Sequence, residues 1–232
     1  LDQAAIDEAR NKALGTSNLV LVHGNFRDID QMVTTHKFGN ISGIVADIGL
    51  SSFQLDGSGR GISFQKEEPL DMRFDLSDNT TDAKFIVNNW EQARLTEIFR
   101  KYGEEKYSSQ IARKIVQHRQ LKLLHSTTDL VSIIQEALPA PEKHRFADSA
   151  RRIFQALRIT VNHELENLET FLPKAFDLLA EGGKLAIVSF HSLEDRIVKE
   201  YFLSLARGCI CPLDFPQCIC GQTPKGKILT KK

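Results

Sequence analysis

The chain of 232 residues is 41% hydrophobic and 26% charged, and its 30 basic residues balance its 30 acidic ones, so its formal net charge is zero. A chain of this length can bury a substantial core, and it contains no run of about eighteen apolar residues, which a membrane-spanning helix would need. Neutral charge argues weakly against a nucleic-acid binder, because phosphate contacts require Lys and Arg; basic side chains nevertheless cluster at 145–158 and 225–232.

The first part of the chain predicts the start of an α/β domain. Residues 3–14 have the apolar spacing of a helix, and residues 19–22 are a short apolar run that predicts a strand before a turn. Residues 41–50 are a second apolar run, too short and too rich in β-branched residues for a helix. They predict a buried parallel strand with Asp47 near its carboxyl end. Residues 56–82 are rich in Gly, Ser, Asp and Asn without a period, which is typical of a functional loop.

The rest of the chain predicts a helical segment and then a return to α/β order. Residues 83–150 have a helical pattern and no strand candidate. The elements expected after them are an amphipathic helix at 148–168, a helix from Leu172-Pro173 to a cap at Gly182-Gly183, a strand at 184–190 and a helix opening with Ser192 as its N-cap. The pattern therefore predicts an α/β sheet interrupted by an all-helical insertion.

Candidate functional residues follow the three expected strands, because ligands of open α/β sheets bind beyond the carboxyl ends of the strands. Phe26 follows the first strand, Asp47 ends the second, and His191 follows the third. Each also has a structural interpretation: a core Phe, a turn or capping Asp, and a helix-capping His. A hydrolase is the weaker hypothesis, since His191 and its neighbouring Ser and acids lie on one turn and cannot form a catalytic triad.

All four cysteines lie in a short C-terminal loop, at 209–221. Cys209 and Cys211 form one C-x-C pair, and Cys218 and Cys220 form another. Four thiolates suffice for tetrahedral zinc, although this spacing is tighter than the usual C-x-x-C knuckle. A structural zinc ion and reduced cysteines both fit the pattern, and disulfides fit it least well.

Several blocks along the chain together resemble one known family. They are DIGLSSFQLD (47–56), RGISF (60–64), PLDMRFD (69–75), YGEE (102–105), FQALRI (154–159), VNHEL (161–165) and SFHSLEDRIVK (189–199). In this order they resemble the small-subunit ribosomal RNA cytosine-N4 methyltransferases of bacteria and organelles. The resemblance implies a Rossmann-like methyltransferase sheet with an inserted all-helical domain and S-adenosylmethionine as methyl donor. Its substrate would be the exocyclic N4 of a cytidine in the decoding region of small-subunit rRNA.

The resemblance also implies site residues and domain limits. The family's cofactor contacts fall on Phe26, Asp47 and Gln54. We expect residues 1–82 and 151–232 to form the two parts of the methyltransferase domain and residues 83–150 to form an RNA-binding insertion. A cytoplasmic location, a small-subunit rRNA partner, no membrane partner and a homodimer are further expectations.

Methylation of an exocyclic amine requires an acceptor for the amine hydrogens, and three residues are candidates for catalysis: Asp47, Asp71 and His191. Arg73 and Arg158 are candidates for RNA contacts, and Arg73 has the alternative role of ordering its loop. The basic residues expected to grip RNA on the insertion are Lys101, Lys106, Arg113, Lys114 and Arg119; on an exposed helix such residues are as often only solvated.

Two departures from the family pattern leave an alternative open. The family's glycine-rich cofactor loop would precede Leu1, and its Arg-rich C-terminal segment would follow Lys232. We therefore expect the sequence to be truncated at both ends and to bind cofactor poorly as it stands. The alternative function is a non-catalytic RNA-binding or ribosome-assembly protein on a methyltransferase scaffold. A methyltransferase acting on DNA or a small molecule is disfavoured by the rRNA-type blocks.

Overall fold

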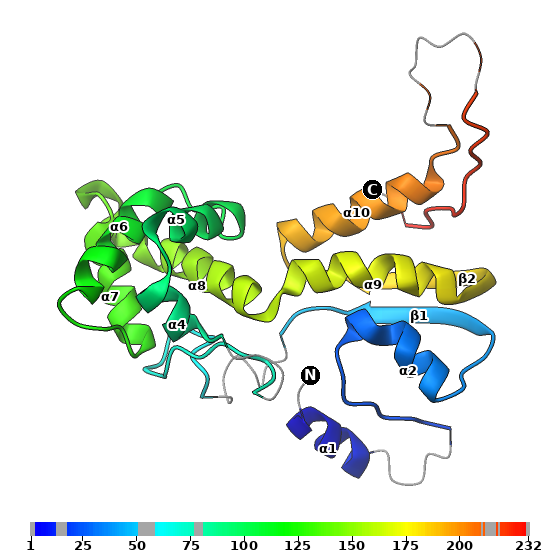
Figure 1. Cartoon of the computed structure of the whole chain (residues 1–232), viewed down its shortest axis with the longest axis horizontal. Helices are drawn as coiled ribbons and strands as arrows, with labels where there is room; N and C mark the ends of the chain where they lie inside the picture. Colours follow the sequence, from blue (N-terminus) through cyan, green and yellow to red (C-terminus); the bar gives the residue numbers. More distant parts are fainter. Residues whose placement is uncertain are drawn as a thin grey trace. The chain divides into compact units, whose positions relative to one another are not determined.

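A computed structural model of the chain describes residues 3–12, 18–50, 59–76, 81–209, 211, 217 and 219–230 (Figure 1). The chain divides into two compact units, and each is described by itself. The first comprises Leu1–Asn25 and Leu50–Glu164, and the second comprises Phe26–Gly49 and Leu165–Lys232. These units do not test the predicted limits of the insertion at 83–150, which stay a prediction.

The second unit contains a parallel pair of strands, β1 (Ile41–Asp47) and β2 (Leu179–Val188). In β1, Ile44 is buried while its neighbour Val45 is 76% exposed, which is the period of two that a strand with one packed face requires. The strand predicted at 41–50 is therefore confirmed as a parallel strand, and the α/β character of the fold with it, but it ends at Asp47 and is packed on one face only, not buried as predicted.

Helices cover the packed side of this strand pair. They are α2 (Ile29–Thr35), α9 (Glu164–Leu178) and α10 (Ser192–Ala206), preceded by the short 3-10 helix η1 (Phe26–Asp28) (Figure 1). Their apolar residues form one core with β1, in which Phe171 and Leu172 of α9 and Val198 of α10 are buried together with Ile44 and Ile48. This core holds the carboxyl ends of both strands in place.

The predicted helix ending at Gly182-Gly183 is wrong, because these glycines lie inside β2. Ile41 pairs with Leu179 and Gly43 with Lys184, so residues 180–183 of β2 stand opposite Ser42 alone. Gly182 has a φ of +79°, which a residue with a side chain rarely adopts. The glycine pair therefore makes a bulge, not a helix cap, and it lengthens the strand predicted at 184–190 toward its N-terminal side.

Three further expectations differ from the structure. The apolar run at 19–22 forms no strand, and Leu19 and Val20 are about half exposed; an apolar run becomes a strand only where it finds a partner. The helix predicted at 148–168 breaks at His163, whose left-handed φ of 52° ends α8 (Phe146–Asn162). α9 then runs through Pro173, so that residue does not begin a helix.

Helices make up most of the described part of the first unit. They are α1 (Gln3–Lys12), α4 (Ala83–Asn89), α5 (Gln92–Lys101), α6 (Ser108–Arg119), α7 (Thr127–Ala137), the 3-10 helix η2 (Ala140–Arg145) and α8 (Figure 1). Leu95, Phe99, Ile111, Leu130 and Leu157 lie in one fully buried core. The helical pattern predicted from 83 to 150 is thus confirmed, and no strand occurs in that range, all of which the structure describes. No described helix is long and apolar enough to span a membrane.

Side-chain caps fix where these helices begin. Asp82 accepts a hydrogen bond from the Phe85 amide at 2.6 Å and starts α4. Ser126 and Asp129 form a reciprocal capping box at the start of α7. Both helix starts lie next to the loop at residues 59–76 and form backbone hydrogen bonds with it. The caps therefore also fix the helix ends to which that loop is bonded.

The second core predicts the effect of truncating its central aromatic residue. Phe171 is 1% exposed and meets the Phe26 ring edge-on, with ring centroids 5.2 Å apart. We expect Phe171→Ala to lower the free energy of unfolding by about 3–5 kcal/mol through lost burial and a cavity. Urea unfolding followed by circular dichroism measures it. Phe38→Ala is the control, because Phe38 is 50% exposed and its truncation should cost less than about 0.5 kcal/mol. Equal unfolding midpoints for the two variants would contradict the central place of Phe171.

Candidate functional site

Asp47 stands at the carboxyl end of β1. It pairs with Val188, the last residue of β2, and the next amide, that of Ile48, donates to the Val188 carbonyl at 3.1 Å. The Asp47 side chain is exposed. An open α/β sheet presents its ligand site at this edge, so the carboxylate is accessible at the position where a ligand is expected.

The segments that follow the two strands lie against each other. Gly49 has a φ of +134°, and a Cβ added there would come within 2.6 Å of the Phe190 ring. Any side chain at position 49 would therefore displace the aromatic ring that follows β2. This close approach brings the backbone after Asp47 next to the Phe190 ring, which immediately precedes His191.

His191 caps α10. Its Nδ1 accepts a hydrogen bond from the Glu194 amide at 3.4 Å, while the Glu194 carboxylate accepts from the amides of Phe190 at 2.9 Å and His191 at 3.3 Å. His191 Nε2 lies 3.3 Å from the other Glu194 oxygen. The N-cap is thus His191 and not Ser192 as predicted, because the imidazole nitrogen reaches the amide that a Ser hydroxyl would have taken. A catalytic role for His191 stays a prediction beside this capping role.

The other two predicted cofactor contacts are Phe26 and Gln54. Phe26 begins η1 and is half-buried, with the edge of its ring against Phe171 in the core of the second unit. Phe26 is therefore not fully enclosed by this core. Gln54 lies outside the described residues.

Asp71 and Arg73 form a bidentate ion pair in the first unit. Arg73 Nε donates to Asp71 Oδ1 and Nη2 to Oδ2, both at 2.7 Å, and the Arg73 amide also donates to Oδ1 at 3.1 Å. Burial raises the pKa of Asp71, but the hydrogen bonds and charge of Arg73 outweigh it, so that pKa lies below its ordinary 3.8. The bond to Asp71 likewise raises the pKa of Arg73. The carboxylate is therefore held ionised and in one orientation.

Asn162, in the last turn of α8, ties down the loop on both sides of Arg73. Its Nδ2 donates to the Met72 carbonyl at 2.8 Å, and its Oδ1 accepts from the Phe74 amide at 2.8 Å. Nδ2 also donates to the Arg158 carbonyl at 3.0 Å. One amide side chain thereby fixes the backbone immediately before and after Arg73.

Arg60 closes the loop from the other side. Its Nη1 donates to the carbonyls of Arg73 at 3.0 Å and Phe74 at 2.8 Å, while its own carbonyl accepts from the Met72 amide at 2.8 Å. Neither Asn162 nor Arg60 was among the predicted site residues, although both lie in the family-like blocks. Because Asn162 acts on a backbone 90 positions away, no local pattern could have shown its role.

Two helix starts complete the attachment of the same loop. The amides of Ala83 and Lys84 at the start of α4 donate to the carbonyls of Asp71 at 2.9 Å and Leu70 at 2.7 Å. The Leu70 amide donates to the His125 carbonyl just before α7 at 3.2 Å. Met72 is fully buried and has a left-handed φ of 63°. The turn that carries Asp71 and Arg73 is therefore held in a single conformation.

Arg158 is engaged in a bidentate ion pair with Glu164, at 2.8 Å from Nε and 3.1 Å from Nη2. The two side chains are 15% and 10% exposed. The guanidinium thus has an internal acid as its partner, and its predicted contact with RNA stays a prediction.

The basic residues of the predicted RNA-gripping helices are only in part directed to solvent. Lys114 pairs with Glu136 at 3.1 Å, and Arg119 donates to the Val87 carbonyl at 2.9 Å. Burial lowers the pKa of Arg119. Lys101 and Lys106 lie over the rings of Tyr102 and Tyr107, at 5.0 and 5.2 Å from the ring centroids. Arg113 is exposed on α6.

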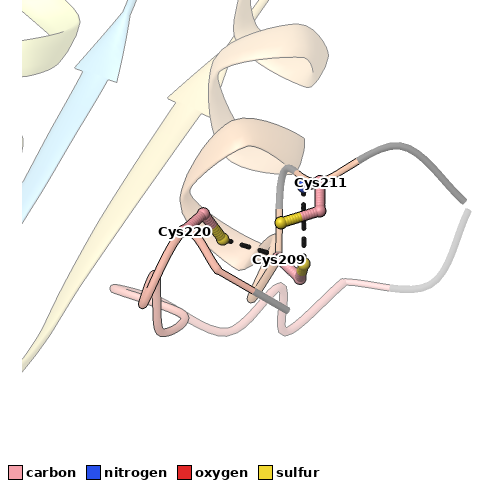
Figure 2. A group of neighbouring side chains, drawn as sticks. All are labelled: Cys209, Cys211 and Cys220. Atoms are coloured by element: carbon pink, nitrogen blue, oxygen red, sulfur yellow. Dashed lines mark hydrogen bonds between the residues drawn. The ribbon is translucent and has the colours of Figure 1, made fainter. Parts of the chain in front are cut away.

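Three of the predicted metal ligands come together after α10. Figure 2 shows Cys209, Cys211 and Cys220 converging, with Cys220 Sγ 3.7 Å from Cys209 Sγ. The three sulfur atoms lie within 4.8 Å of one another. Cys218 lies outside the described residues.

The Asn162 contacts predict a stability effect. Asn162→Ala leaves the Met72 carbonyl and the Phe74 amide without their side-chain partner, and we expect a loss of about 2–4 kcal/mol in the free energy of unfolding. Chemical denaturation measures this loss. Asn89→Ala is the matched control, because Asn89 is exposed and its Nδ2 donates only to the Phe85 carbonyl of its own helix, at 2.9 Å. It should change stability by less than about 0.5 kcal/mol. A loss for Asn162→Ala no larger than the control's would show that the loop does not depend on Asn162.

Comparison with known proteins identifies the family. The sequence model of the MraW methylase family matches residues 1–232. The chain is 44% identical over 231 residues to the ribosomal RNA small subunit methyltransferase H of Halothermothrix orenii. It is 47% identical over 233 residues to the protein of that name from Heliobacterium modesticaldum, and 43% identical over 231 residues to that from Clostridium botulinum. Each match covers 100% of this chain and 74% of the relative. The chain therefore belongs to the MraW methylase family, a family of S-adenosylmethionine-dependent methyltransferases.

Proposed function

We propose that the protein transfers a methyl group from S-adenosylmethionine to the exocyclic N4 of a cytidine in the decoding region of small-subunit rRNA. The observation that carries this proposal is the similarity, over the whole chain, to relatives that are named ribosomal RNA small subunit methyltransferase H. The finer assignment to N4 of a decoding-region cytidine rests on the resemblance of the sequence blocks. A homodimer stays a prediction.

The end of β1 fits a nucleoside cofactor. The exposed Asp47 carboxylate accepts hydrogen bonds, which suits ribose hydroxyls or the cofactor's ammonium group. The half-buried Phe26 ring is positioned by Phe171 and suits stacking on an adenine. When bound, the cofactor supplies an electrophilic methyl group on a sulfonium. In the proposal Asp47 and Phe26 bind and orient the cofactor.

The acceptor amine sets a second requirement. The lone pair of the cytosine N4 is delocalised into the ring, so the amine is a weak nucleophile, and it must be aligned while its nitrogen becomes pyramidal. A fixed acceptor for the amine hydrogens assists this change. Asp71 suits this role, because a carboxylate offers about four lone-pair positions and Arg73 occupies three of those on Asp71.

The low pKa of Asp71 decides between two roles for its carboxylate. A carboxylate with a lowered pKa is a weaker base than an ordinary Asp, so proton abstraction by Asp71 gains nothing from its surroundings. A hydrogen-bond acceptor, in contrast, benefits from being ionised and immobile. We therefore assign Asp71 to the orientation of the amine, with Arg73 as the residue that positions Asp71.

RNA binding adds a further step in the proposal. A cytidine within folded rRNA must leave its stack before an enzyme can act on the base. Basic side chains on the first unit, including Lys101, Lys106 and Arg113, would hold the surrounding phosphates in this proposal. Lys101 and Lys106 also lie over tyrosine rings, which restricts where their charges point.

The function is tested by methyl transfer from labelled S-adenosylmethionine to intact small ribosomal subunits, to naked 16S-type rRNA and to DNA. We expect label in the rRNA of one of the first two substrates and none in DNA. Nuclease digestion and mass spectrometry of the nucleosides should place it on N4 of cytidine. Label on another atom would overturn the N4 assignment. Absence of label from all three substrates, with binding to rRNA retained, would favour a non-catalytic RNA-binding protein.

Asp47→Ala tests the cofactor assignment. We expect it to abolish methylation of rRNA from a strain that lacks the modification, because the cofactor loses its carboxylate partner. The circular dichroism spectrum should stay unchanged, since the side chain is exposed. Asp177→Ala, which removes an exposed carboxylate from α9 of the same unit, should retain activity. Full methylation by Asp47→Ala would remove Asp47 from the site.

Asp71→Asn tests the orientation of the amine. We expect kcat to fall by about a hundred-fold while KM for the cofactor stays unchanged, because only a group acting in the transition state is weakened. Glu67→Gln, which changes an exposed carboxylate just ahead of this turn, is the control and should keep wild-type rates. A wild-type kcat for Asp71→Asn would exclude this role.

The lowered pKa of Asp71 also sets a pH dependence. Because the folded pKa is lower than the ordinary 3.8, the stability due to the Asp71–Arg73 pair is present above that value and is lost as the pH falls through the folded pKa. The difference in unfolding free energy between wild type and Asp71→Asn should therefore be constant at neutral pH and shrink only in acid. A difference that already declines near neutral pH would contradict the lowered pKa.

A further inference from the structure

The sulfur cluster after α10 has the spacing of a metal site. Cys209, Cys211 and Cys220 each offer one sulfur, and all three sulfurs lie within 4.8 Å of one another (Figure 2). Two thiolates bound to one tetrahedral zinc ion at the usual Zn–S distance lie about 3.8 Å apart. The 3.7 Å between Cys209 Sγ and Cys220 Sγ matches this edge of a tetrahedron.

The backbone around Cys209 favours a thiolate. The Cys211 amide donates a hydrogen bond to Cys209 Sγ at 3.4 Å, and a hydrogen bond of this kind stabilises the charged sulfur more than the neutral thiol (Figure 2). Three thiolates around a divalent ion leave a net negative charge. The exposed cationic side chains of Arg207 and Lys225, close to the cysteines in sequence, are suited to offset it.

The cysteines lie on two chain segments, one that leaves the end of α10 and one that returns to it. The amides of Lys225 and Gly226 donate to the Leu205 carbonyl in the last turn of α10, at 2.8 and 3.2 Å. Gly208 lies against Pro224, since a Cβ added at Gly208 would be 3.3 Å from that ring. Cys209 and Cys211 are on the departing segment and Cys220 is on the returning one. An ion held by all three would join the two segments beside these backbone contacts.

We propose that Cys209, Cys211 and Cys220 bind a zinc ion that clips the returning C-terminal segment to the end of α10. Soft thiolate ligands select zinc over hard cations such as Mg²⁺ and Ca²⁺. The site is independent of the methyl-transfer residues, so its failure would leave the proposed function untouched. A disulfide is the competing use of these residues, and it would require the Cys209 and Cys220 sulfurs to approach from 3.7 Å to about 2.05 Å.

Metal analysis of the whole chain, purified under reducing conditions and reconstituted with zinc, tests the site. We expect about one equivalent of zinc per chain, loss of zinc on treatment with a thiol-blocking mercurial, and thiolate-to-cobalt charge-transfer absorption after replacement by Co²⁺. Cys209→Ser and Cys220→Ser should each lose the ion and lower the thermal midpoint of the zinc-loaded protein. Gln217→Ala, an exposed change within the same loop, should keep both the ion and the midpoint.

Three results would overturn the site. The first is less than about a tenth of an equivalent of zinc in the reconstituted wild type. The second is zinc retained by a folded Cys209→Ser, Cys220→Ser double variant, whose folding is checked by circular dichroism. The third is a Cys209–Cys220 disulfide, found by mapping peptides of the protein purified without reductant, that persists in the presence of zinc.

Discussion

The hydrogen bonds of Asn162 are the constraint on which the loop that carries Asp71 and Arg73 depends. A turn with a buried, left-handed Met72 exposes backbone groups that helices and strands would otherwise satisfy, and a buried polar group without a partner is costly. The single side chain of Asn162 satisfies backbone groups on both sides of Arg73. It donates to the Met72 carbonyl and accepts from the Phe74 amide. Arg60 and the starts of α4 and α7 then remove the remaining freedom. The loop is irregular in shape and yet as well supported as a helix.

This rigidity gives the Asp71–Arg73 pair its chemical character. On a mobile loop an exposed ion pair gains little, because two long side chains must be ordered to form it. Here the backbone already holds the two residues in position, and the bidentate bonds at 2.7 Å keep the carboxylate ionised without further ordering. A fixed, charged acceptor is what the weakly nucleophilic amine of a cytosine requires in the proposed reaction. The fixed position of the acceptor thus originates in an amide side chain that need not touch the substrate.

Local sequence patterns predicted those elements whose formation depends mainly on neighbouring residues in the chain. The strand at 41–47 followed from its β-branched run, the helices after residue 83 from their periodicity, and Asp71 and Arg73 are close enough in sequence to be recognised together. Some failures were local, such as the left-handed turn at His163 and the cap at His191, but others depended on distant partners. The run at 19–22 is apolar enough for a strand but does not become one, Gly182 serves a bulge defined by its pairing with β1, and the 90 positions between Asn162 and Met72 hide their contact. Resemblance to a family supplied the cofactor residues, which spacing alone could not separate from a turn Asp and a core Phe.

At the end of β2, a catalytic role of His191 must be distinguished from its structural role as the cap of α10. Glu194 accepts from the amides of Phe190 and His191, and His191 in turn accepts from the Glu194 amide, so the two side chains start α10 by capping each other. Phe190, between the strand and this cap, lies against Gly49, two residues beyond Asp47. Loss of the His191 imidazole would therefore loosen the cap, the Phe190 ring and the backbone after Asp47 together. Activity would then fall even if the imidazole makes no contact with the target cytosine. Only a variant that keeps the capping acceptor, such as His191→Asn, distinguishes a base contact from a structural role, because Asn is a strong N-cap residue and lacks the ring.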